Sequence, residues 1–321
     1  MSNNIKSEMN KIDVPKELHE RSKSGIHQAK NEMSGNHRYW MKGMVLAAGL
    51  LVMLGGYGVY KNTLQTEQAL PNNKSPQVIE GKGIVIPAIE LPDTTSKNES
   101  YDMIGLIVYN GKIYTQTATS IEVEEAKSLL GEKLGRTKGT IDEWSSQDEY
   151  SKEFASSIGE MDVYTAKGYD KDFRIMVYSE RGGDFYAEFY ECLNGITIAT
   201  GQDVFGKLKI DGNLLNAQYR KFSDWDFDKQ HYYPINDPAI LQSFVEALNQ
   251  TVPHPREGVE AALGDFRNDD GSKELILNLQ DGSKISLFLI KGGFIRYGFT
   301  DVYFKMENET FINMWDQMNM N

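Results

Sequence analysis

The sequence predicts an α+β protein: an N-terminal amphipathic helix, one transmembrane helix, and then two extracytoplasmic modules, each an antiparallel sheet with a packed helix. Three observations lead to this class. Residues 43–60 form an uninterrupted run without a charged side chain. The pairs Asn110-Gly111 and Asp281-Gly282 each separate two stretches of strand-forming residues, which is the pattern of a β-hairpin. Apolar residues recur at helical spacing in 238–249 and 309–318. Sheets and helices segregated in this way are typical of α+β modules.

Length and charge set the first limits. The 321 residues allow about two globular units plus connecting segments. With 40% hydrophobic and 25% charged residues, the composition excludes a mostly disordered chain and a multi-span membrane protein. Residues 1–43 hold eight basic and five acidic side chains, a balance of +3. Because the whole chain has a net charge of −12, the remaining residues carry −15. So acidic a surface argues against nucleic acid as a partner and against non-specific binding to anionic headgroups.

The uncharged run is just long enough to cross a bilayer. At about 1.5 Å per residue it would span about 27 Å, close to the roughly 30 Å hydrocarbon core. Aromatic residues flank it at Trp40 and Tyr60. A cleaved signal peptide and a buried core helix are the alternatives, but the run begins only at Gly43, after a long polar segment. Its glycines also disfavour a helix in a soluble core. We therefore predict a transmembrane helix over residues 44–60.

The flanks of the run predict its orientation. Basic residues near it lie mainly on the N-terminal side: Lys23, Lys30, Arg38 and Lys42 before it, Lys61 and Lys74 after it. The positive-inside rule then places the N-terminus in the cytoplasm of a single-pass protein of the cell membrane, with the C-terminal region outside. Cys192 is the only cysteine, so no disulfide can form within the chain.

Within the predicted cytoplasmic segment, 1–43, the pattern of residues 13–33 predicts one amphipathic helix. Pro15 suits the first turn, and Asp13 can cap it. Five apolar residues share one stripe of this helix: Val14, Leu18, Ile26, Ala29 and Met33. An isolated helix cannot bury such a stripe against itself. We predict that the stripe binds a partner; a solvated leader without a binding role is the alternative.

The same segment carries a resemblance to a known family. Residues 9–18 read MNKIDVPKEL, and they are followed by Ser22-x-x-Gly25-Ile26-x-x-Ala29-Lys30, a basic stretch and the span. This arrangement, which extends as far as Tyr60, resembles the start of membrane-bound anti-sigma factors of Gram-positive bacteria. It implies a regulator of transcription that binds a sigma factor, or another cytoplasmic regulator, and takes part in signal transduction by sensing an envelope signal outside. The chain departs from the zinc-containing class of these proteins, because no cysteine lies near its N-terminal histidines.

Beyond the span, the prolines and polar residues of 61–100 indicate a Pro-containing linker. The first module, 101–222, begins with a hairpin whose Asn-Gly turn is of type I′, with positive φ at both central residues. A helix over 121–134 follows. The remaining strands predicted in this module are 162–166, 173–179, 185–192 and 195–200.

The second module, 223–321, is predicted from the same signals. Asp237 can cap the helix at 238–249, and Pro238 suits its first position. The second hairpin joins 274–279 to 284–290 through Asp281-Gly282, with a turn of the same class as the first. Strands at 293–297 and 302–306 and a closing helix at 309–318 complete the module.

A cluster of acidic and aromatic residues starts the second module. Its candidate ligand-binding residues are Asp224, Trp225, Asp226 and Tyr232. Carboxylates beside aromatic rings suit a carbohydrate or peptide site, and a glycosidase would use two such carboxylates. A calcium loop is excluded, since Lys229 and Ile235 stand where Gly and Glu are needed. A solvated connector between modules is the alternative interpretation.

The sequence contains no recognisable catalytic motif. The glycines at 131 and 135 lack the Gly-Lys-Ser/Thr of a phosphate loop, and neither His231 nor His254 has a second histidine at metal-binding spacing. We therefore predict no catalytic residue, no metal and no cofactor. The expected protein is a membrane regulator. An anchored extracytoplasmic binding or structural protein without a sigma-factor partner is the main alternative, and an extracytoplasmic hydrolase is a further one.

Overall fold

The computed structural model describes residues 75–89, 104–142, 145, 148, 151–181 and 184–319. Contacts divide the chain between Gln65 and Thr66, so all described residues belong to the second of two units. The predicted span, 44–60, and the predicted cytoplasmic helix lie outside the described residues, as do the stripe residues Val14, Leu18, Ile26, Ala29 and Met33. No helix of the described part is long and apolar enough to cross a membrane.

The prediction of an α+β class is wrong for the described residues, which are mostly β. Strands account for 40% and helices for 22%, and the helices are short. The predicted helix at 121–134 illustrates the reason. Only α4 (Val123–Leu129) is helical, and β6 (Leu130–Arg136) follows it directly. The leucines of 121–134 have helical spacing, but pairing of β6 with β7 (Asp162–Ala166) outweighs it. Gly131 and Gly135 also weaken a helix in this segment.

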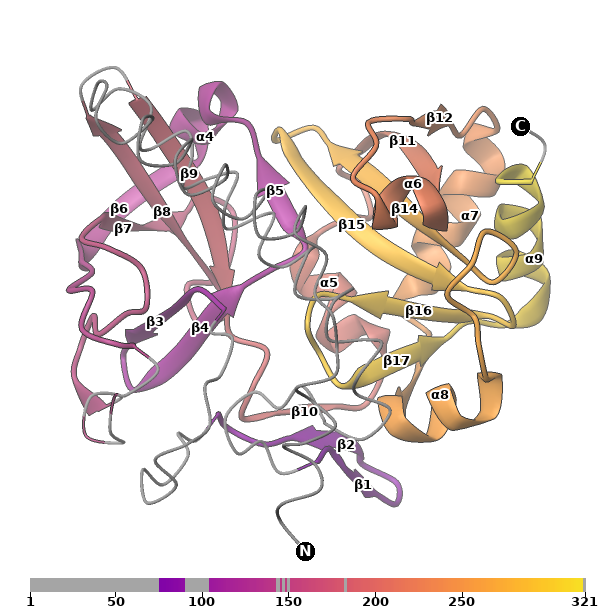
Figure 1. Cartoon of the computed structure of the whole chain (residues 1–321), viewed down its shortest axis with the longest axis horizontal. Helices are drawn as coiled ribbons and strands as arrows, with labels where there is room; N and C mark the ends of the chain where they lie inside the picture. The colour runs from indigo at the N-terminus through magenta and orange to yellow at the C-terminus, as the bar shows by residue number, and fades with distance from the viewer. Residues whose placement is uncertain are drawn as a thin grey trace, which may run out of the picture. The chain divides into compact units, whose positions relative to one another are not determined.

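A six-stranded antiparallel sheet has the order β3-β4-β9-β8-β7-β6 (Figure 1). Its further strands are β3 (Leu106–Tyr109), β4 (Lys112–Gln116), β8 (Arg174–Arg181) and β9 (Asp184–Glu191). The first hairpin is confirmed. Asn110 and Gly111 have φ values of 51° and 67°, as a type I′ turn requires.

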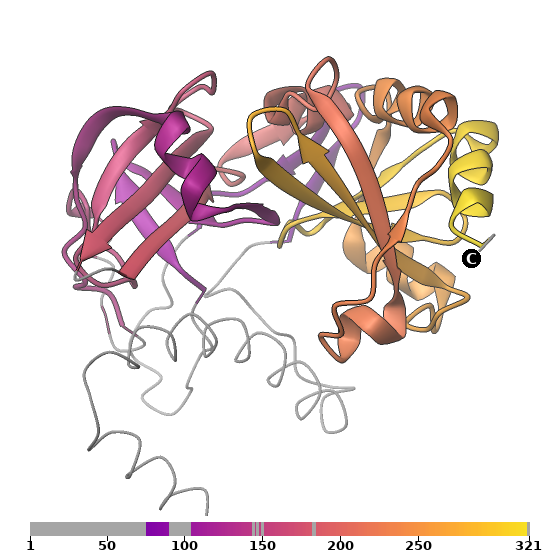
Figure 2. The ribbon, with the colours of Figure 1, turned by 90° about the horizontal axis from the view of Figure 1, so that it is seen from above.

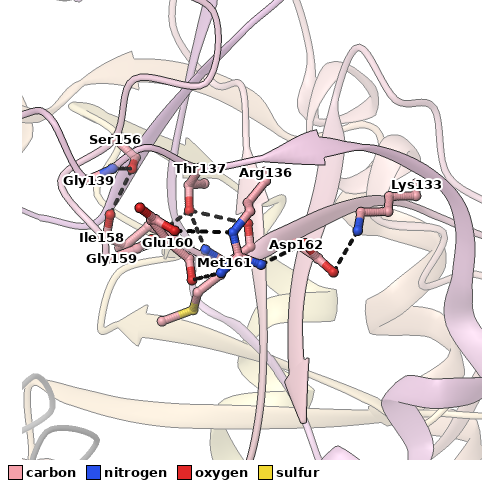
Figure 3. A network of polar contacts seen from close by, with 10 residues as sticks. All are labelled: Lys133, Arg136, Thr137, Gly139, Ser156, Ile158, Gly159, Glu160, Met161 and Asp162. Carbon is pink, nitrogen blue, oxygen red and sulfur yellow. Dashed lines mark hydrogen bonds and ion pairs between the residues drawn. The ribbon is translucent and has the colours of Figure 1, made fainter. Parts of the chain in front are cut away.

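Residues 154–157 join the two edges of this sheet. Phe154 N donates to Val108 O of β3 at 2.8 Å, and Lys138 N, just after β6, donates to Phe154 O at 3.0 Å. Figure 3 shows the side chains at this join, where Thr137 Oγ1 donates to Gly159 O at 2.5 Å. The sheet thus closes on itself around an apolar interior that includes Ile107, Val163, Ile175, Val177 and Tyr190.

A small sheet, β1-β2-β10, comprises β1 (Gln77–Ile79), β2 (Gly83–Ile86) and β10 (Ile196–Ile198). After β10 come the 3₁₀ turn η2 (Gly201–Asp203) and the short helix α5 (Phe205–Leu208). Three isoleucines of this sheet, Ile84, Ile86 and Ile198, enter the main core of the large sheet.

The large sheet has the order β12-β11-β14-β15-β16-β17-β13, and β5 (Thr119–Ile121) also pairs with β15. Its strands are β11 (Leu214–Lys221), β12 (Tyr233–Pro234), β13 (Val252–Pro255), β14 (Ser272–Leu279), β15 (Ser283–Ile290), β16 (Phe294–Tyr297) and β17 (Val302–Lys305). Both β5 and β11 precede residue 223, where the second module was predicted to begin. The division into modules at 222/223 stays a prediction.

Helices cover both faces of the large sheet. On the inner face, α7 (Pro238–Leu248) and α9 (Asn308–Gln317) pack on the leucines of β14 and β15. The Asp237 cap is confirmed, since its carboxylate accepts from the N–H groups of Ala239 and Ile240. The outer face is partly covered by α6 (Phe222–Asp226) and α8 (Arg256–Leu263). Figure 2 shows α6 and α7 on opposite sides of the strands.

The hairpin between β14 and β15 is confirmed, but the class of its turn is not. Of the predicted turn pair only Gly282 has a positive φ, 86°. A type I′ turn needs two such residues. Here Gly282 N donates to Leu279 O at 3.1 Å, and Asp281 Oδ1 accepts from Ser283 N at 2.9 Å. The aspartate thus stabilises the turn through its side chain rather than by a left-handed backbone.

Candidate ligand site on the outer face of the large sheet

The outer face of the large sheet carries a row of side chains that crosses six strands. Cross-strand pairing aligns Arg220 with Glu274, Glu274 with Phe288, Phe288 with Arg296, and Tyr303 with His254. β16 and β17 pair at the adjacent position, Ile295 with Phe304, which places Arg296 beside Tyr303. We call these six residues the outer row: Arg220, Glu274, Phe288, Arg296, Tyr303 and His254.

Strand alternation explains why these side chains face outward. In β14 and β15 the leucines at 275, 277, 287 and 289 are fully buried in the inner core. Because successive side chains point to opposite faces, Glu274 and Phe288 must lie on the other face. The row therefore follows from the same pattern that forms the core.

At one end of the row, Arg220 and Glu274 form a buried ion pair. Each side chain is 7% exposed, and Arg220 Nε donates to Glu274 Oε2. Ser286 Oγ donates to the other carboxylate oxygen of Glu274 at 2.5 Å. Arg220 Nη1 also donates to Lys229 O at 3.3 Å and lies 3.7 Å from Asp228 Oδ1. The charge of Arg220 is therefore compensated.

Near the other end, Glu260 of α8 accepts hydrogen bonds from three side chains. Its Oε1 accepts from Tyr303 Oη at 2.5 Å, from Arg256 Nε at 2.9 Å and from Arg267 Nη2 at 3.4 Å. Burial alone would raise the pKa of this carboxyl, but the bond from Tyr303 and the charge of Arg256 together hold the pKa below its usual range. Arg256 Nη1 also lies 3.5 Å from Asp301 Oδ1. Both carboxylates here are thus already engaged.

Arg296 lies between these two groups and has no carboxylate of its own. Its guanidinium carbon lies 5.0 Å from the centre of the Phe288 ring. The side chain is partly exposed, and within the described part of the chain it makes no hydrogen bond and no ion pair. Burial lowers the pKa of Arg296, and the charges of Arg256 and Arg267 lower it further, against the opposing effects of Tyr303 and Glu260. The row therefore contains one cation whose charge the described residues leave unpaired.

The aromatic end of the predicted acidic cluster reaches this row. Trp225 packs on Phe288, with ring centroids 5.1 Å apart, and Phe222 lies 6.2 Å from the same ring. The ring of Tyr232 lies 5.4 Å from the guanidinium carbon of Arg220, and its hydroxyl donates to Gln230 Oε1 at 3.0 Å. Two predicted residues, Trp225 and Tyr232, thus flank the outer row.

The two predicted aspartates differ in their surroundings. Asp224 is 7% exposed, and its carboxylate lies 3.4 Å from both Lys229 Nζ and His231 Nδ1. Asp226 is partly exposed at the last residue of α6. The carboxylate of Asp224 is thus held within the 224–231 segment and does not join Trp225 at the row. Among the described residues, no three His, Cys, Asp or Glu side chains come together in a way that could hold a metal ion.

Sequence reasoning missed Arg296, Arg256, Arg267 and Glu260. Alternation within 294–297 puts Arg296 opposite the apolar Ile295 and Tyr297, which is a usable signal for an outward side chain. Its neighbours, however, come from β15, β17 and α8, and only the strand order brings them together. Comparison of the chain with protein families, with curated proteins and with solved structures finds no match.

Proposed function

We propose that this chain is a single-pass membrane regulatory protein. Residues 1–43 bind a sigma factor in the cytoplasm, and the C-terminal β-rich unit binds an envelope ligand outside. The observation that carries the proposal is the order of three segments: an amphipathic basic segment, the uncharged run 43–60, and an acidic folded unit. This order resembles that of membrane-bound anti-sigma factors, and each segment suits the compartment that the proposal gives it.

Two features of the folded unit support the proposal. The contact boundary at Gln65/Thr66 falls shortly after Tyr60, the last residue of the uncharged run. The C-terminal unit thus begins where a domain outside the membrane would begin. Its outer row combines aromatic rings with the unpaired guanidinium of Arg296, and such a surface suits ligand binding.

Binding of purified sigma factors to the full chain tests the cytoplasmic part of the proposal. The variant Leu18→Asp with Ile26→Asp places two charges on the apolar stripe, whereas Ser24→Asp with Asn31→Asp adds the same charge on the polar face. We expect one of the host's extracytoplasmic-function sigma factors to bind the full chain and the polar-face control. We expect binding to fall at least tenfold for the stripe variant and to vanish when residues 1–43 are deleted. Undiminished binding by the truncated chain contradicts the proposal.

The alternative is an anchored extracytoplasmic binding protein without a sigma-factor partner. The outer row favours this candidate as much as the first, because its chemistry does not depend on residues 1–43. If no sigma factor of the host binds the full chain while the outer face binds a ligand, this alternative replaces the first proposal.

A further inference from the structure

We propose that Arg296 is the centre of a carboxylate-binding site on the outer row, and that its ligand is a carboxylate attached to an apolar group, as in a peptide. The inference deepens the proposed function, because it names the ligand class of the extracytoplasmic unit. It does not depend on the sigma-factor partner.

The first argument is charge. Three arginines, Arg256, Arg267 and Arg296, gather around α8 and β16, while the carboxylates of Glu260 and Asp301 pair only with the first two. Glu260 already accepts from Arg256, Arg267 and Tyr303. One positive charge is left over, and it belongs to Arg296. A single carboxylate would neutralise it, whereas a phosphate dianion would introduce more negative charge than the site compensates.

The second argument is geometry. Cross-strand pairing with Phe288 places the Arg296 guanidinium over the phenyl ring, with 5.0 Å from its carbon to the ring centre. The ring attracts the guanidinium through its charge and accepts no N–H hydrogen bond in the plane of the group, so the Arg296 N–H donors remain available to a ligand. Two parallel N–H donors in one plane match the two oxygens of a carboxylate. Arg296 thus offers a planar set of donors that suits a planar anion.

The third argument is the apolar surroundings. Trp225 and Phe222 lie against the same Phe288 ring, with centroids at 5.1 and 6.2 Å. Trp225 is partly exposed. An apolar group next to the carboxylate can therefore pack on the Trp225 side while the carboxylate meets Arg296. Free acetate would lack this contact and bind more weakly.

Arg296 carries a cost that a purely structural residue would not. An unpaired cation that is partly desolvated destabilises the folded state, and an apolar side chain of similar length would pack on Phe288 without that cost. Functional sites commonly retain such local penalties. The unpaired charge is therefore better explained by ligand binding than by stability.

Isothermal titration calorimetry on the purified full chain in phosphatidylcholine nanodiscs tests the site. The probe is N-acetylphenylalanine, whose carboxylate lies next to an apolar ring, and its uncharged amide is the reference compound. Inorganic phosphate forms a separate arm. We compare the natural chain with Arg296→Met, which keeps the apolar stem, and with Arg296→Lys, which keeps the charge without the planar fork. Lys284→Gln removes a cation from the same strand as Phe288 and is the matched control.

We expect saturable binding of the carboxylate and at least tenfold weaker binding of the amide and of phosphate. Arg296→Met should weaken carboxylate binding at least tenfold and Arg296→Lys by a smaller factor, while Lys284→Gln changes it less than twofold. Circular dichroism melting of each variant identifies any that fails to fold, and Arg296→Lys then decides the outcome. Equal affinity for the carboxylate and its amide, or unchanged affinity in both Arg296 variants, overturns the site. Tighter binding of phosphate overturns the carboxylate assignment.

Sigma-factor binding by the same variants separates this inference from the proposed function. Arg296→Met should bind the sigma factor as the natural chain does when no probe is present. Loss of carboxylate binding with intact sigma-factor binding is the expected combination. Absence of carboxylate binding by the natural chain, with intact sigma-factor binding, contradicts only the ligand class.

Discussion

A fully buried ion pair on the six-stranded sheet shows what one residue can contribute to this protein. Arg174 and Glu191 are cross-strand partners on β8 and β9, and both side chains are 0% exposed. Glu191 Oε2 also accepts from Thr117 Oγ1 at 2.8 Å and from Tyr297 Oη of the large sheet at 2.8 Å. Arg174 lies over the Tyr169 ring at 4.3 Å. The carboxylate of Glu191 thus connects strands of two sheets.

Replacing Glu191 by Gln should destabilise the protein strongly. The variant leaves the charge of Arg174 buried without a counter-ion, and losing one partner of a buried pair costs about 3 to 5 kcal/mol. Glu160→Gln is the matched control, because Glu160 also pairs with an arginine, Arg136, at 3.4 Å, but its side chain is 67% exposed. That pair should contribute less than about 1 kcal/mol. Urea denaturation of both variants measures the difference, and similar losses would contradict the assigned role of Glu191.

Arg296 differs from Arg174 in the compensation of its charge. The Arg174 guanidinium bonds twice to Glu191 Oε1, at 2.9 and 2.5 Å, and once to Thr119 at 3.0 Å. Arg296 has the Phe288 ring and no acceptor of its own among the described residues. The sequence alone cannot tell the two arginines apart, since both lie on strands with apolar neighbours. Only their partners, which are distant in sequence, distinguish a structural cation from a candidate binding residue.

At the scale of elements, local patterns predicted most strands and two helices. The predicted strand at 162–166 matches β7, and the predicted helix at 238–249 matches α7 except at its last position. Each of these has a clear period and a local turn or cap signal. The prediction for 121–134 is wrong because its leucines fit a helical period. The secondary structure of its second half depends instead on pairing with β7, which lies well downstream in the chain. Non-local pairing also assembles the outer row, so its centre, Arg296, could not be predicted, although Trp225 and Tyr232 beside the row were.

The two hairpin turns give a prediction at this scale, because glycine is required in each for a different reason. Gly111 has φ 67°, and an added Cβ would meet no atom within 4 Å. Gly282 has φ 86°, and its Cβ would lie 2.7 Å from Cβ of Glu125 in α4. Gly111→Ala should cost about 1 to 2 kcal/mol from backbone strain alone. Gly282→Ala should cost more, because α4 must also move.

Thermal unfolding of the two alanine variants, followed by circular dichroism, measures these costs. The Gly282 variant should melt several degrees below the Gly111 variant. Equal melting temperatures would mean that α4 does not pack against the turn of β14 and β15. Asn110→Ala gives a second measure of backbone strain in the first hairpin, since Asn110 also has a positive φ, 51°.

At the scale of the whole molecule, the distribution of charge and of cysteine matters most. The segment before the uncharged run carries +3, and the rest of the chain carries −15. An acidic unit is repelled by an anionic membrane surface, whereas a basic segment is attracted to one, so the two charges suit opposite sides of the span. The proposed topology rests on this asymmetry of charge. Because the chain has a single cysteine, labelling of introduced cysteines can test the topology directly.

Cys192 is 5% exposed, and burial raises the pKa of its thiol, so it should react slowly with maleimides. A single cysteine introduced elsewhere then reports on one position. With a membrane-impermeant maleimide on intact cells, Gln68→Cys should be labelled and Ser24→Cys should not, because Gln68 follows the predicted span and Ser24 precedes it. Permeabilised cells should label both, which controls for reactivity, and the natural chain gives the background. Labelling of Ser24→Cys in intact cells would reverse the orientation. Labelling of neither variant until permeabilisation would place both segments inside and remove the extracytoplasmic ligand from the proposed function.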